Sequence, residues 1–285
     1  MSTTTARTES GWIRFWNQGT WWKAVLLVVV YWLVYQGIAL ITSTVFASSI
    51  DTSDLFGTPQ SIFVAMALPI LLAGLLLVLF MRSVGWLGDS FARQPRSARP
   101  WMWVAVVLVL IPNAMRLFGT EWSQWTITQV LTILFLGLCI GFAEELLTRG
   151  AVVTMLRRGG YGQRAVMVLS AFLFAILHSG NAITGEGGAA VIFTVVYTFG
   201  FGVLMYLSMV VTGRLIWAIL LHASTDPTTM LVISGVDGHG HTVGHPDGLV
   251  SIAGLFNFVY VAFAVLAIFL VKKHSDAKNV SSGSH

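Results

Sequence analysis

Charged residues are scarce in this chain of 285 residues: Asp, Glu, Lys and Arg make up only 10% of it, while 56% is hydrophobic. A soluble domain carries about 25% charged residues, so this composition cannot cover a water-facing surface of ordinary polarity. It suits a surface covered by lipid. The net charge of +4 does not favour nucleic-acid binding, because the basic residues fall in short clusters between apolar runs. Such clusters suit anionic lipid headgroups and the orientation of membrane spans.

Cysteine is nearly absent as well. The only one, Cys139, lies within an apolar run, so no disulfide framework forms within one chain, and the redox compartment stays open. Residues 1–22 lack a small-residue cleavage site after a short apolar core, so we do not expect a secretory signal there. They instead form a tail whose Trp-rich part suits the headgroup region of a membrane.

Long apolar runs are what the sequence has in abundance. A membrane-spanning helix needs about 20 predominantly apolar residues, and eight segments meet or approach this length. They are 24–46, 61–81, 101–117, 126–148, 165–178, 189–211, 215–234 and 249–271. We therefore predict an all-α, polytopic integral membrane protein with about eight helices in one bundle. The helical membrane domain covers 23–273, with a disordered tail at 274–285.

The positively charged residues lie on one side of such a bundle. With eight spans, all sixteen Lys and Arg residues except Arg116 fall on the same face, which carries both termini. The opposite face carries acidic residues, namely Asp51, Asp54, Glu121, Glu186, Asp237 and Asp247. Because Lys and Arg favour cytoplasmic loops, we expect both termini in the cytoplasm.

Five ionisable side chains fall inside predicted spans: Glu144, Glu145, His178, His222 and Asp226. Placing a charged group in hydrocarbon costs on the order of 2.5–3.5 kcal/mol even on lenient scales, so such residues usually face the bundle interior and mark a site. At 1.5 Å per residue, measured from the basic residues that bound the spans, Glu144, His178 and Asp226 all lie about 18–21 Å along their helices. This estimate fails if Arg149 marks the boundary of the fourth span.

Helical spacing relates these residues to their neighbours. Glu145 and Arg149 are four residues apart, share a helix face and can pair, whereas Glu144 is rotated by about 100° and points elsewhere. Phe174 lies one turn before His178, so its ring can pack against the imidazole. His222 and Asp226 also share a face. Gly141 leaves room beside Glu144 for a neighbour or a substrate.

Three motifs follow from these spacings: EExxxR at Glu144–Arg149, FxxxH at Phe174–His178 and HxxxD at His222–Asp226. In this order, on successive apolar helices, they resemble the CAAX-protease and bacteriocin-processing family, which includes the Ras-converting enzyme and many bacterial abortive-infection-type membrane proteins. The resemblance covers about 140–230. It implies an eight-helix intramembrane endopeptidase without a metal or other cofactor, in a bacterial plasma membrane. The site would lie between the fourth, fifth and seventh helices and open towards the basic, cytoplasmic face.

The resemblance also implies roles. Glu144 would be the general base that activates water, helped by His178, and His222 with the residue at 226 would polarise the scissile carbonyl and stabilise its oxyanion. Glu145, Arg149 and Phe174 would support them. The family's Ras-converting branch has asparagine where this chain has Asp226, and an ionised aspartate donates no hydrogen bond. Asp226 is therefore protonated, orients His222, or acts as a second carboxylate beside Glu144.

Other functions stay open at this point. A zinc-dependent membrane protease could use Glu144, His178 and His222, although no HExxH spacing supports it. A transporter or proton relay is disfavoured because the chain shows no repeated halves, and a scaffold or immunity protein with an unused site is a further alternative. The substrate would be a membrane-associated peptide or lipidated protein. Oligomeric state cannot be read from the sequence.

A second polar cluster lies in a Gly-rich stretch near the outer face. His239, His241 and His245 stand there with Asp237 and Asp247, and His-x-His spacing can bind zinc or copper. The many glycines make a solvated loop the better interpretation. Cys139, one or two turns before Glu144, is interpreted as a packing residue.

Overall fold

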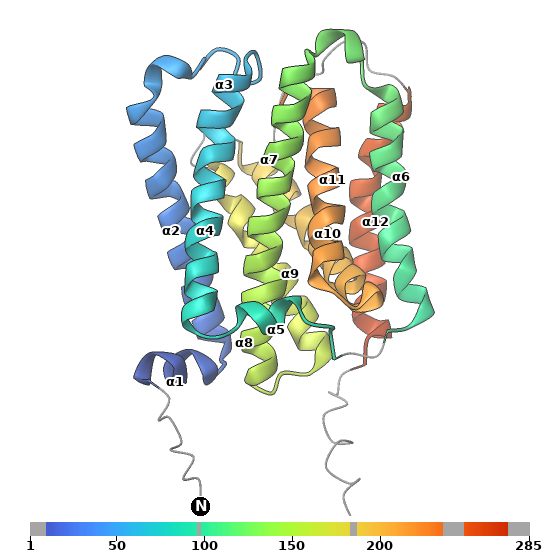
Figure 1. The fold of residues 1–285 in the computed structure, drawn as a ribbon. Helices are drawn as coiled ribbons and strands as arrows, with labels where there is room; N and C mark the ends of the chain where they lie inside the picture. Colours follow the sequence, from blue (N-terminus) through green and yellow to red (C-terminus); the bar gives the residue numbers. More distant parts are fainter. Residues whose placement is uncertain (1–9, 96–97, 183–186, 236–247, 273–285) are drawn as a thin grey trace, which may run out of the picture.

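The computed structural model describes residues 10–95, 98–182, 187–235 and 248–272, and every regular element within these ranges is a helix (Figure 1). Eight helical segments in these ranges are long and apolar enough to cross a membrane. They are Trp21–Val45, Pro59–Ser83, Pro100–Gly119, Ile127–Arg158, Gln163–Ala182, Gly188–Thr212, Leu215–Ile233 and Gly248–Leu270. Each corresponds to one of the eight predicted spans, so the predicted fold class is confirmed.

The helices run alternately up and down, joined by short connections (Figure 1). They comprise α2 (Trp21–Val45), α3 (Pro59–Ile62), α4 (Leu68–Ser83), α6 (Trp103–Gly119), α7 (Ile127–Glu145), α8 (Val153–Arg158), α9 (Gln163–Leu177), α10 (Gly188–Thr212), α11 (Leu215–Ile233) and α12 (Gly248–Leu270). Two short helices, α1 (Gly11–Asn17) and α5 (Leu87–Phe91), lie across the lower end in this view.

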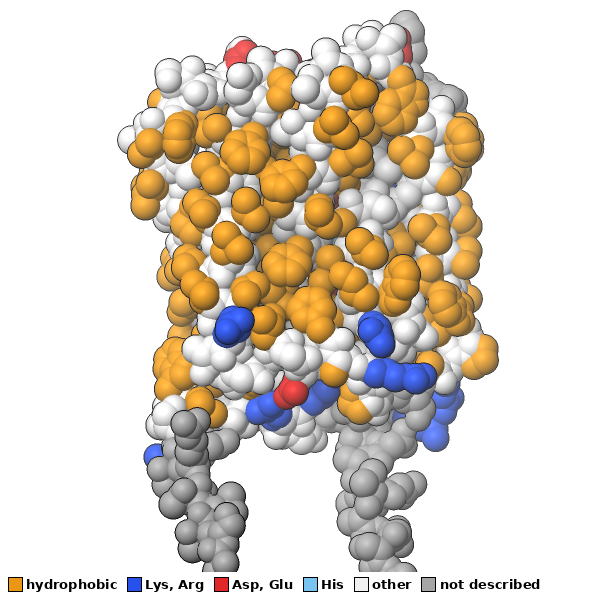
Figure 2. Space-filling model, viewed as in Figure 1, with side chains coloured by type: hydrophobic (Ala, Val, Ile, Leu, Met, Phe, Trp, Pro, Cys, Tyr) orange, Lys and Arg blue, Asp and Glu red, His pale blue; other side chains and the backbone are white. Residues whose placement is uncertain are grey.

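Apolar side chains cover the flanks of the bundle (Figure 2), and many of the largest are strongly exposed, including Leu79, Phe118 and Phe269. Such a surface matches lipid rather than water. Lys and Arg side chains gather at the lower end of the same view. The predicted histidine cluster His239, His241 and His245, and the predicted tail 274–285, lie outside the described residues.

The Trp-rich N-terminal segment forms α1, which packs against the bundle. Trp16 is buried and meets Phe80 edge-on at 5.1 Å between ring centroids. Trp12 Nε1 donates a hydrogen bond to Ser83 Oγ at 3.0 Å, and Trp86 Nε1 donates one to Asn17 Oδ1 at 2.9 Å. These bonds fix α1 to the turn after α4.

The fourth span is longer than predicted. The sequence analysis ended it at 148 because Arg149 was assigned to the basic face. In the structure Arg149 is buried, and the helix continues through a π-helical segment (Leu146–Val152) into α8, which ends at Arg158. The placement of Arg149 at the membrane boundary was therefore wrong, because an ion pair keeps this charge inside the bundle.

The closest helix crossing joins α7 to α11, which pack against each other more extensively than any other described pair. A Cβ atom on Gly141 would lie 2.6 Å from Ala223 N, and one on Gly137 would lie 2.2 Å from Pro227 Cγ. Both distances are too short for any side chain, so the two glycines allow the backbones to approach. The predicted close approach at Gly141 is confirmed.

This crossing yields a test. We expect Gly141→Ala to destabilise the protein by about 1–3 kcal/mol, because the methyl group meets backbone atoms that cannot move aside cheaply. The matched control is Gly37→Ala, at an exposed position of α2 where a Cβ atom meets nothing within 4 Å. Thermal unfolding in detergent measures both. Equal midpoints for the two variants would contradict the packing explanation.

Candidate active site

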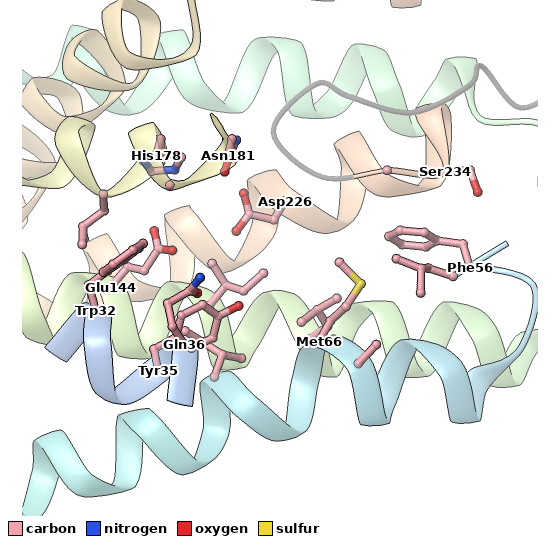
Figure 3. Close-up of a pocket in the computed structure, with 18 of the residues that line it drawn as sticks. Trp32, Tyr35, Gln36, Phe56, Met66, Glu144, His178, Asn181, Asp226 and Ser234 are labelled. Atoms are coloured by element: carbon pink, nitrogen blue, oxygen red, sulfur yellow. The ribbon is translucent and has the colours of Figure 1, made fainter. Parts of the chain in front are cut away.

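A cavity of about 640 Å³ lies between α2, the segment before α4, α7, the end of α9, and α11. All four predicted catalytic residues line it: Glu144, His178, His222 and Asp226. Figure 3 shows Glu144, His178 and Asp226 projecting into the same space from three different helices. The structure thus brings together residues that are up to 82 positions apart in the sequence.

The two adjacent glutamates point in different directions, as their 100° offset predicts. The Glu144 side chain is 20% exposed and faces the cavity, whereas the Glu145 side chain is fully buried. Glu145 Oε1 accepts a hydrogen bond from Arg149 Nη1 at 3.0 Å and lies 2.8 Å from His222 Nδ1. One buried carboxylate oxygen therefore holds both an arginine of its own helix and a histidine of α11.

His222 is almost completely buried, and carboxylates face both of its ring nitrogens. Its Nδ1 atom contacts Glu145, while its Nε2 atom lies 3.8 Å from Glu144 Oε2 and 3.5 Å from Asp226 Oδ2. The two Nε2 distances are longer than ordinary hydrogen bonds. The contact with Glu145 therefore fixes the ring orientation, and Nε2 faces the cavity between the carboxylates of Glu144 and Asp226.

Arg149 is held by more than its ion pair. Its Nη2 atom donates to Gly202 O at 2.7 Å, its Nη1 atom donates to Thr148 Oγ1 at 2.5 Å, and the guanidinium lies 4.6 Å from the centroid of the Phe174 ring. These contacts join α7, α9 and α10 around one cation. Burial of a charge is tolerated only with such compensation.

His178 stands where α9 ends and a 3₁₀ turn begins. Its Nδ1 atom lies 3.1 Å from Phe174 O, and the two rings meet edge-on with centroids 4.9 Å apart, as their spacing predicts. The Phe174 ring also lies 5.7 Å from the His222 ring. Phe174 therefore packs between both histidines and the buried arginine.

A second, smaller cavity of about 250 Å³ shares His178, His222 and Asp226 with the first and adds Arg116 and Tyr260. Arg116 lies in the last turn of α6, at the end opposite the other basic residues, as predicted, and it is only 9% exposed. It falls inside the predicted span 101–117. No motif in the sequence marked the residues of α2 that line the main cavity; they are Tyr31, Trp32, Tyr35 and Gln36.

The main cavity extends towards the end of the bundle opposite the Lys and Arg residues. Its lining continues from Glu144 to the connection at residues 52–56 and to Ser234, which follows α11. In Figure 3, Phe56 and Ser234 lie far from Glu144 along the cavity. The sequence predicted an opening towards the basic face, whereas the described lining of this cavity reaches the opposite end.

Within residues 10–95, 98–182, 187–235 and 248–272, no three His, Cys, Asp or Glu side chains are grouped so that they could hold a metal ion. Cys139 is buried and free, one or two turns from Glu144.

The buried ion pair yields a test. We expect Arg149→Met to destabilise the protein by about 3–5 kcal/mol, because it leaves the Glu145 charge buried without its cation. Arg158→Met is the matched control, since Arg158 pairs with Asp89 at the surface, where an ion pair contributes about 0–1 kcal/mol. Unfolding midpoints in detergent compare them. Adding Glu145→Gln to Arg149→Met should recover part of the loss, and no recovery would argue against the charge as its cause.

The part of the chain that forms this site is similar to a known family. Residues 125–228, which contain all the predicted site residues and their three motifs, match the family model described as type II CAAX prenyl endopeptidase, Rce1-like. No curated protein and no solved structure gave a match. The match confirms the resemblance predicted from the motifs: residues 125–228 are similar to the Rce1-like type II CAAX prenyl endopeptidase family.

Proposed function

We propose that this protein is an intramembrane endopeptidase that hydrolyses a peptide bond of a membrane-associated or lipidated substrate through water activated by Glu144. One observation carries the proposal: a partly exposed carboxylate, Glu144, shares a cavity within the bundle with two histidines and a second carboxylate from two other helices. Placing ionisable groups inside a membrane bundle costs free energy, so such groups usually mark a functional site.

The chemistry starts at Glu144. Its carboxylate takes a proton from a water molecule, and the resulting hydroxide attacks the scissile carbonyl carbon. Charge then develops on the carbonyl oxygen, where a donor aimed into a water-poor cavity is most effective. His222 is such a donor when its ring is protonated on both nitrogens, because Nδ1 then donates to Glu145 and Nε2 donates into the cavity. His178 is a second. The proton on Glu144 passes to the amide nitrogen as the carbon–nitrogen bond breaks.

Glu145 and Arg149 act as positioning residues in this proposal. Glu145 accepts from His222 Nδ1, which fixes the ring orientation, so that Nε2 faces the cavity. Arg149 holds Glu145 in turn. A hydrogen bond to one ring nitrogen of a histidine commonly fixes the ring orientation, and it determines which nitrogen faces the reacting group.

Asp226 takes the orienting role among the three alternatives. It lies one helical turn from His222 on the same face, with Oδ2 3.5 Å from Nε2, and shares the second cavity with Arg116. This position suits Asp226 to orient the His222 ring rather than to donate to an oxyanion.

The competing functions gain no support. A zinc site from Glu144, His178 and His222 is not favoured, since the described side chains form no metal-ligand group, and no observation favours a transporter or a scaffold. The apolar flanks show an integral membrane protein surrounded by lipid. Bacterial origin and cytoplasmic termini remain part of the proposal.

The proposal is tested by cleavage of a quenched peptide library by the purified protein in detergent. Glu144→Gln, His178→Ala and His222→Ala should each lower kcat/KM at least 100-fold, because each removes a group that acts on water or on the oxyanion. Cys139→Ser is the matched control on α7 and should keep normal activity.

Thermal unfolding shows whether each variant is folded, which separates lost chemistry from lost structure. Chelators should leave the activity unchanged. Inhibition by a chelator that zinc reverses would replace the glutamate mechanism with a metal mechanism. Full activity of Glu144→Gln would refute the proposal.

Asp226 has its own test. Asp226→Asn should keep a measurable part of the activity, because asparagine retains the polar contact with His222, whereas Asp226→Leu should lose it about as fully as His222→Ala does. The pH dependence of kcat/KM should shift in Asp226→Asn, since a charge near the histidine disappears. An unchanged pH profile would show that Asp226 does not act on the ring.

A further inference from the structure

The two ends of the bundle differ in charge. In the described part of the chain, one end carries Arg14, Lys23, Arg82, Arg93, Arg99, Arg157, Arg158, Arg164, Arg214 and Lys272, several of which appear at the lower end of Figure 2. The connections at the other end carry Asp51, Asp54 and Glu121. Lys and Arg accumulate in cytoplasmic loops of membrane proteins, whereas acidic residues have little effect. The basic end is therefore the cytoplasmic end.

The basic end is closed below the candidate site. All seven residues of the π-helical segment Leu146–Val152 are buried, and this segment separates Glu144 from the basic residues that follow it. Met81, in the last turn of α4, and Trp86, in the turn after it, are fully buried in the same core. A layer of buried side chains therefore lies between Glu144 and the basic end.

The other end is where the cavity reaches the surface. Residues 52–55 line it and are exposed. This rim is well ordered: Asp51 Oδ1 accepts hydrogen bonds from Ser53 N at 2.9 Å and Ser53 Oγ at 2.5 Å, and these bonds hold the pKa of the Asp51 carboxyl below its usual range. Gln129 Nε2 donates to Phe56 O at 2.9 Å, which fixes the rim to α7.

We infer that the cavity receives its substrate from the extracytoplasmic side of the membrane, as an extended peptide segment of neutral or positive charge. This inference rests on the proposed function and deepens it. Glu144 lies 17 residues from Ile127, where α7 begins, so it is about 25 Å along the helix from that end. An extended chain covers about 3.3 Å per residue, so roughly eight residues bridge the distance.

The charge of the segment follows from the lining. The acidic side chains along the cavity are Asp54 near the rim and Glu144 and Asp226 at the far end, and its described lining contains no Lys or Arg. A peptide with acidic residues would be repelled along this path, whereas Lys or Arg residues would be attracted. A substrate processed on the cytoplasmic face, such as a prenylated cytosolic carboxyl terminus, does not meet these conditions.

The side of access can be measured without any activity. On a Cys139→Ser background, Ser53→Cys places a thiol at the cavity rim. Ser83→Cys, the matched control, places one on the last residue of α4 at the basic end. A membrane-impermeant maleimide applied to intact bacterial cells should label Ser53→Cys, and should label Ser83→Cys only after the membrane is permeabilised. The opposite pattern would overturn the inference.

A second experiment tests the role of the cavity rim by measuring activity. Modification of Ser53→Cys with a bulky polyethylene-glycol maleimide should lower cleavage of a quenched peptide at least tenfold, whereas the same modification of Ser83→Cys should not. Of two peptides that differ only by Lys or Glu beside the cleaved bond, the Lys peptide should be cleaved at least fivefold faster. Equal cleavage after rim modification, or faster cleavage of the Glu peptide, would overturn the proposed path. If the wild type cleaves no peptide, the proposed function fails, while the labelling result still decides the side of access.

Discussion

A single buried carboxylate oxygen organises the centre of this protein. Glu145 Oε1 is shared by Arg149, one turn along its own helix, and by His222 of α11. A buried carboxylate or guanidinium without its partner is strongly destabilising in a low-dielectric interior. Glu145, Arg149 and His222 must therefore assemble together. Their assembly fixes the crossing of α7 and α11, where two glycines already bring the backbones together. It also fixes the His222 ring, whose other nitrogen faces the cavity.

The same constraint separates the two adjacent glutamates into different tasks. Glu145 is surrounded by partners and excluded from the cavity, whereas Glu144, one residue earlier, projects into it. A helix turns by 100° per residue, so two neighbouring carboxylates can serve a structural network and a reaction without competing. Arg149 then becomes part of the framework, held by Gly202 O and the Phe174 ring.

Much of this could be predicted from the sequence, because membrane helices and their internal spacings are local properties. The eight spans, the Glu145–Arg149 pair and the packing of Phe174 on His178 all follow from hydropathy and helical period. What failed was the assignment of Arg149. It looks like a boundary residue in the sequence, and only the fold shows the carboxylate and the carbonyl that keep it inside. The hydrogen bond between His222 and Glu145 joins residues 77 positions apart, which no local pattern contains.

The wrong boundary at Arg149 had a larger consequence than its ten residues of helix. With the span ending at 148, Glu144 would stand barely one turn from the basic surface. With the span ending at Arg158, a buried π-helical segment lies between Glu144 and that surface. The lining of the cavity reaches residues 52–55 at the acidic end. One ion pair, by keeping a guanidinium inside the bundle, thus decides how deep the candidate base lies along its helix.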